Sequence, residues 1–196
     1  TDLPSTCNSI FVPTFSVNEY RYAESWTYYK NKIWYDTGEG PANNQIWYKT
    51  TDGNTITTSG VRGIQLGPDD DGDYYTTQLS MLSNVYDNGF GIMTFDDEVG
   101  ELNWALNSKT TLSSIILPPT LFSIYGSFGG CASLTDVILP NSNTTIGSSF
   151  NNCDGIEKIY LPTDLTVKNS FSGCDNFSEI YSTYATTDHR CIIKDN

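Results

Sequence analysis

The sequence predicts an α+β, mainly β protein built around a short solenoid of three to four turns of about 22 residues. Three observations lead to this fold class. A 14-residue pattern recurs along the second half of the 196-residue chain. The segment before it carries the turn signals of β-hairpins, and the first 35 residues read as a strand followed by a helix.

The repeat is clearest in SFGGCASLTDVILP (127–140), SFNNCDGIEKIYLP (149–162) and SFSGCDNFSEIYST (170–183). Its aromatic, cysteine and proline positions each recur every 21 or 22 residues. These columns are Phe128, Phe150 and Phe171; Cys131, Cys153 and Cys174; and Pro118, Pro140 and Pro162. An earlier unit at 102–118 is degenerate, since Lys109 stands at the cysteine position. A unit this short cannot bury its own apolar face, so the copies are expected to stack.

Each unit is expected to supply one short strand to the stack. In LTDVIL the side chains of Leu134, Val137 and Leu139 would face the core. The proline that follows would end the strand, because it lacks the N–H that a sheet requires.

The pattern F-x-x-C-x-x-L-x-x-I-x-L-P, followed by I-G-x-S-F, resembles the BspA-type leucine-rich repeats over residues 102–181. Such repeats are common in surface proteins of Bacteroides-like gut and oral bacteria, and occur in some protozoan parasites. The stretches 43–57 and 84–102 resemble the β-rich segment that often precedes these arrays, and 5–33 resembles the element that closes one.

The resemblance implies a secreted or surface-anchored binding module, held at the outer membrane in the full-length protein. It implies adhesion to host or bacterial surface proteins, or to glycans. The absence of an initiator methionine and of a signal peptide suggests a mature or excised fragment.

The chain is expected to divide into five segments. Residues 1–35 form a strand and a helix, whose start carries the capping box of Ser16 and Glu19. Residues 36–44 form a linker and 45–100 a β-hairpin cap. Residues 101–183 hold the repeats, and 184–196 begin a closing element in which Cys191-Ile-Ile echoes the neighbourhood of Cys7.

Two hairpins are expected in the cap segment. QIWYKT and NTITT flank the turn Asp52-Gly53, and SNVY and GFGIMTF flank Asp87-Asn88-Gly89. Their strands would cover the open end of the solenoid, which otherwise exposes unpaired backbone groups.

The cysteine column admits four interpretations: small buried side chains, disulfides between neighbours, a zinc site, or a nucleophile. Buried thiols fit best, because stacked neighbours seldom have disulfide geometry. A zinc site is disfavoured, because one cysteine comes from each turn and His189 is the sole histidine. With five cysteines at least one has no partner within the chain, and Cys7 and Cys191 are expected to be the exposed pair.

Composition and motifs argue against several function classes. The net charge of −13 disfavours nucleic-acid partners, and no apolar run approaches the length of a membrane span. The acidic stretch 67–75 lacks the EF-hand spacing, and nothing beside His189 and Cys191 would orient a catalytic pair. Two glycosylation sequons, at Asn143 and Asn176, carry no weight in a bacterial protein. The sequence therefore predicts no enzyme, no cofactor and no metal site.

The outward positions of the repeat strands form two columns that are candidate binding residues. They are Ile116, Ile138, Tyr160 and Tyr181, with Asp136, Lys158 and Glu179 beside them. An exposed apolar column would mark an interaction surface. Alternatively, these residues only stabilise the ladder as cross-strand neighbours. A structural spacer within a longer surface protein and a glycan-binding module using Tyr and Trp also remain open.

Overall fold

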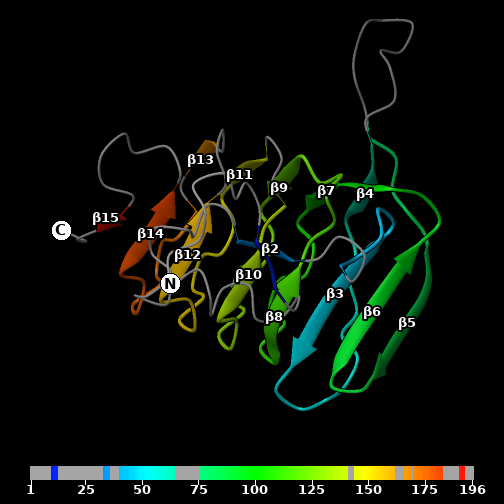
Figure 1. Ribbon diagram of the computed structural model, residues 1–196, viewed down its shortest axis with the longest axis horizontal. Coiled ribbons are helices and arrows are strands. Elements are labelled where there is room, and N and C mark those ends of the chain that lie inside the picture. Colours follow the sequence, from blue (N-terminus) through cyan, green and yellow to red (C-terminus); the bar gives the residue numbers. More distant parts are fainter. Residues whose placement is uncertain are drawn as a thin grey trace, which may run out of the picture. The chain divides into compact units, whose positions relative to one another are not determined.

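The computed structural model describes residues 10–12, 33–35, 40–64, 76–140, 144–161, 166–168, 170–182 and 190–192. These residues are mostly β-strands, with no helix among them (Figure 1). The chain falls into two units, Thr1–Gly40 and Pro41–Asn196. The predicted helix with its Ser16 and Glu19 capping box lies outside the described residues. So do the acidic stretch 67–75, Cys7, His189 and Asn143.

In the first unit, β1 (Ile10–Val12) pairs in parallel with β2 (Ile33–Tyr35), with Ile10 opposite Ile33. The first strand was predicted. The second strand was not predicted, since the rest of residues 1–35 was expected to hold a helix.

The repeats build two rows of parallel strands. The first row contains β7 (Val99–Asn103), β9 (Ser123–Tyr125), β11 (Thr145–Gly147) and β13 (Thr166–Lys168), in that order (Figure 1). Their central residues are in register, with Leu102, Ile124, Ile146 and Val167 opposite one another in turn. This column lies on the core side of the row in the turns whose side chains are described.

The second row begins with β8 (Leu112–Ile116) and β10 (Asp136–Ile138), which are also parallel. Further along the repeats, β12 (Lys158–Leu161) pairs in parallel with β14 (Glu179–Ser182). The last strand, β15 (Arg190–Ile192), is antiparallel to β14. Each repeat thus supplies two strands, one to each row, and not the single strand that the sequence predicted.

The segment before the repeats extends both rows with antiparallel strands. β3 (Gln45–Thr50) pairs with β8, and β4 (Val61–Gly63) pairs with β7. β6 (Phe90–Phe95) continues the sheet beyond β3, and β5 (Met81–Asp87) lies at its edge (Figure 1). The predicted hairpin at Asp87-Asn88-Gly89 is confirmed. The positive φ of Asn88 (50°) and Gly89 (85°) suits the tight turn that joins twisted strands.

The hairpin predicted around Asp52-Gly53 is wrong. The turn forms, but residues 54–60 make no strand, because β3 already pairs with β6 on one side and β8 on the other. Instead, the backbone of the buried Ile56 forms hydrogen bonds with side chains of β3 and β5. Its N–H donates to the Tyr48 hydroxyl at 3.4 Å, and its carbonyl accepts from Asn84 Nδ2 at 2.7 Å.

Cys131, Cys153 and Cys174 are buried free thiols, which confirms their predicted burial. Each Sγ donates a hydrogen bond to a backbone carbonyl of the preceding turn. The acceptors are Leu106 at 3.1 Å, Phe128 at 3.0 Å and Phe150 at 2.9 Å. Burial raises the pKa of Cys131 to about 11 and that of Cys153 to about 12. These thiols therefore stay protonated at neutral pH, and thiolate chemistry is unfavourable there.

Replacing Cys153 distinguishes a tightly packed thiol position from a loose one. We expect Cys153→Ala to cost no more than about 1 kcal/mol, since the Phe128 carbonyl keeps its bond from the Cys131 N–H. Cys153→Leu should cost about 1–3 kcal/mol, because the larger side chain overpacks a fully buried turn. Urea unfolding of both variants measures the difference. An equal cost for the two substitutions would contradict tight packing at this turn.

Candidate binding surfaces

The predicted binding columns are aligned within two pairs of repeat strands, β8 with β10 and β12 with β14. Ile116 lies opposite Ile138, and Tyr160 lies opposite Tyr181. The polar column is aligned in the same way, with Ser114 opposite Asp136 and Lys158 opposite Glu179.

The predicted exposure of the apolar column is wrong for the two residues that can be assessed. Ile116 is 0% exposed and Ile138 is 1% exposed, although neither belongs to the main core cluster. A strand buried on both faces has a continuous apolar run, as in Ile115-Ile116-Leu117, and not an alternating one. This apolar run was the feature of the sequence from which the burial of Ile116 could have been predicted. Asp136 and Lys158 are partly exposed, and the side chains of Tyr160, Tyr181 and Glu179 lie outside the description.

The same column continues across the cap sheet. Trp47 lies opposite Ile116, Ile92 opposite Trp47, and Val85 opposite Ile92. We call this line of cross-strand neighbours the outer row: Ile138, Ile116, Trp47, Ile92 and Val85. Burial falls along it, because Trp47 and Ile92 are half-buried and Val85 is 58% exposed. The side chains of the outer row are therefore buried at the repeat end and exposed to solvent at the cap end, which we call its open end.

The open end of the outer row lies on an edge strand. Among the described strands, β5 pairs with β6 alone. It also carries Leu82, which is 67% exposed, and Met81, which is 38% exposed. Beside it, the rings of Trp47 and Phe90 are in contact, with centroids 5.3 Å apart. An exposed apolar edge of this kind favours contact with another chain.

A second surface lies at the start of the repeats, where Trp104 and Tyr125 form an exposed aromatic pair. Their rings are perpendicular, with an interplanar angle of 83° and centroids 6.0 Å apart. Trp104 is 61% exposed and Tyr125 is 48% exposed. Large aromatic rings this exposed bring little stability to the core, so the pair is a candidate binding feature.

Glycines in the following turn support both rings. A Cβ at Gly126 would lie 2.6 Å from the Trp104 indole, and one at Gly147 would lie 3.0 Å from the Tyr125 ring. Trp104 itself has a positive φ of 55°, and its N–H donates to the Tyr125 carbonyl at 2.8 Å. Each ring thus packs against the backbone of the next turn and remains partly open to solvent.

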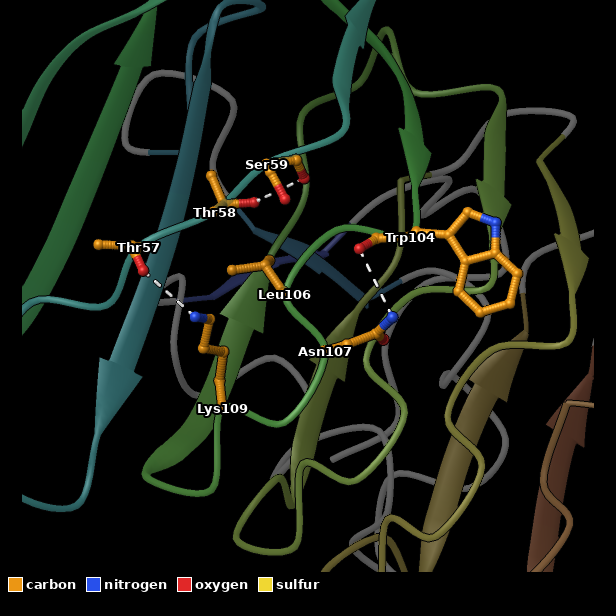
Figure 2. A pocket seen from close by; sticks show the side chains of 7 residues that line it. All are labelled: Thr57, Thr58, Ser59, Trp104, Leu106, Asn107 and Lys109. Atoms are coloured by element: carbon orange, nitrogen blue, oxygen red, sulfur yellow. Dashed lines mark hydrogen bonds between the residues drawn. The ribbon is translucent and has the colours of Figure 1, made fainter.

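A cleft of about 280 Å³ is lined in part by Trp104 (Figure 2). Its lining is mainly polar and consists of Thr57, Thr58, Ser59, Trp104, Leu106, Asn107 and Lys109. Lys109 Nζ donates to Thr57 Oγ1 at 3.2 Å. Asn107 is held in place by its Nδ2 bond to the Gly126 carbonyl at 2.9 Å. The Trp104 indole points away from Thr57 and Ser59 (Figure 2).

The Trp104 surface was not predicted from the sequence, although a signal was present. Trp104 aligns with Gly126 of the next turn, and Lys109 replaces the cysteine of later turns. The sequence interpretation took Lys109 as a sign of a degenerate first unit and assigned no role to Trp104. In the structure they lie at the same cleft, so the degenerate unit is chemically distinct from the others.

Within the described parts of the chain, no group of three or more His, Cys, Asp or Glu side chains could hold a metal ion. Nor does that part contain a helix long and apolar enough to cross a membrane.

Comparison with known proteins identifies the repeats. The family described as "BspA type Leucine rich repeat region (6 copies)" matches residues 103–190. No curated protein and no solved structure matches the chain. The matched span covers the paired strands of the repeats and begins at the end of β7. By this match and by the spacing of their Phe, Cys and Pro columns, residues 103–190 are a BspA-type leucine-rich repeat region.

Proposed function

We propose that this chain is a non-catalytic protein-interaction module of a secreted or cell-surface protein, used in adhesion. Leucine-rich repeat regions suggest protein interaction, and the observation that supports it here is the open end of the outer row. Val85 and its edge strand present exposed apolar side chains where Trp47 and Phe90 provide aromatic area. Such clusters of aromatic and aliphatic side chains often supply most of the energy of a protein interface.

The proposed partners are host or bacterial surface proteins. With a formal charge of −13, the chain repels strongly acidic surfaces and favours partners that are neutral or basic. No cofactor is required for this role.

We also propose that the repeats form a continuous solenoid. Support comes from the parallel register of the strands and from the thiol-to-carbonyl bonds, which link each turn to the one before it. A stack of this kind gives a rigid base for residues that contact a partner.

The test is a binding screen of the chain against purified extracellular matrix proteins, followed by substitution at the outer row. Val85→Asp places a charge in the exposed apolar end and should weaken binding about tenfold or more. The control is Ala132→Asp, which places the same charge at an exposed repeat turn and should leave binding unchanged. Surface plasmon resonance gives both affinities.

Equal binding by the wild type and Val85→Asp would contradict the assigned surface. Absence of binding to every matrix protein would favour the spacer alternative, in which the repeats hold another domain away from the cell.

A further inference from the structure

We propose that the Trp104–Tyr125 aromatic pair and the adjoining cleft bind a neutral oligosaccharide. The site lies on the strand row of β7 and β9, whereas the proposed protein-binding surface lies on β3, β6 and β5. The inference is therefore independent of the proposed function.

The form of the aromatic pair suits a sugar ring. A pyranose ring has a face of C–H bonds that packs well on an aromatic face, provided that the aromatic ring is exposed and fixed. The indole meets both conditions, since it is 61% exposed and rests on the Gly126 backbone. Tyr125 stands perpendicular to it and adds a second wall.

The side chains around the rings also suit a sugar. The outward positions of β7, β9 and β11 near the pair are polar: Glu101, Asn103, Ser123 and Thr145. Surfaces that bind proteins usually surround their aromatic residues with apolar ones, as the outer row does. Hydroxyl and amide groups beside an aromatic ring match a sugar, which offers many hydroxyls around its apolar face.

The cleft beside Trp104 offers further polar groups. Thr57, Thr58 and Ser59 contribute hydroxyls, and Lys109 contributes an ammonium that already bonds to Thr57. Because Trp104 borders the cleft while its indole points outward, a ligand of more than one sugar could contact both features (Figure 2). The net charge of −13 disfavours sulfated or sialylated glycans, which leaves neutral ones.

The test is isothermal titration calorimetry with maltohexaose, cellohexaose, chitohexaose and mannohexaose, and with a heparin hexasaccharide as the anionic comparison. We expect at least one neutral hexasaccharide to bind. Trp104→Ala should lower its affinity about tenfold or more, through loss of one stacking ring. Tyr125→Ala should also weaken binding, and Trp104→Tyr should retain most of it.

Val85→Asp serves as the matched control and should leave sugar affinity unchanged, which separates this site from the proposed protein-binding surface. Thermal unfolding of each variant verifies that the fold is intact, as expected for substitutions of exposed side chains. The proposal is overturned if no neutral hexasaccharide binds, if heparin alone binds, or if affinity survives Trp104→Ala.

Discussion

Gly60→Ala is expected to destabilise the protein by about 3 kcal/mol or more. Gly60 has a φ of 73°, a left-handed conformation that costs other residues energy. An added Cβ would also overlap the backbone carbonyl oxygen of Asn103. That contact cannot relax easily, because the Asn103 N–H donates to the Gly60 carbonyl at 2.8 Å and thereby joins β7 to the residue just before β4.

The chain offers a closely matched control for this prediction. Gly53 has almost the same φ, 71°, but no atom lies within 4 Å of the position that its Cβ would occupy. Gly53→Ala should therefore cost only the conformational strain, about 1 kcal/mol. Urea unfolding gives both free energies. Similar losses for the two variants would show that the contact between Gly60 and Asn103 is unimportant.

Phe150→Ala is expected to cost about 3–5 kcal/mol of unfolding free energy. The Phe150 side chain is fully buried and stacks between the equivalent rings of the neighbouring turns. Its centroid lies 5.0 Å from that of Phe128 and 5.6 Å from that of Phe171, with nearly parallel planes. Truncation would leave a cavity between three turns, because backbone held by ladder bonds can collapse only slightly.

Leu82→Ala is the control for Phe150→Ala. It also removes a large apolar side chain, but one that is 67% exposed, so we expect a change within about 0.5 kcal/mol. A loss below about 1 kcal/mol for Phe150→Ala would mean that the aromatic column does not hold neighbouring turns together.

The periodicity of the sequence predicted the inward-facing core of the repeats well. Leu134, Val137 and Leu139 are buried as expected. They could be predicted because most copies of the repeat have apolar residues at the same positions. The strands at Ser123–Tyr125 and Thr145–Gly147 were not predicted, because each has a single apolar core residue, Ile124 or Ile146, which is too few to show alternation.

Pairing between distant segments was harder to predict. Asp52-Gly53 and Asp87-Asn88-Gly89 are both good turn sequences, but only the second joins two paired strands. Turn propensity is local, whereas the pairing of β3 depends on β8, which lies more than 60 residues further along the chain. The burial of Ile116 also follows from packing outside its own strand, so outward position was a poor guide to exposure.

The binding surfaces were predicted least well. The aromatic pair joins residues of two successive turns, Trp104 and Tyr125, whose rings meet only when the turns stack. The only sign of the pair in the sequence is Trp104 at the position that Gly126 occupies in the next turn. Such a departure from the repeat pattern looks the same as simple degeneration of a terminal unit.

The claim that successive turns stack around one continuous core is tested most directly by mapping the reactivity of individual cysteines. The chain is treated with a bulky maleimide before and after unfolding in urea, and each site is quantified by mass spectrometry. We predict that Cys131, Cys153 and Cys174 stay unlabelled in the native protein, because they are buried and bonded to carbonyls of the preceding turns. All three should react fully after unfolding. Rapid native labelling of any of them, or a failure to label after unfolding, would contradict the stacked core of free thiols.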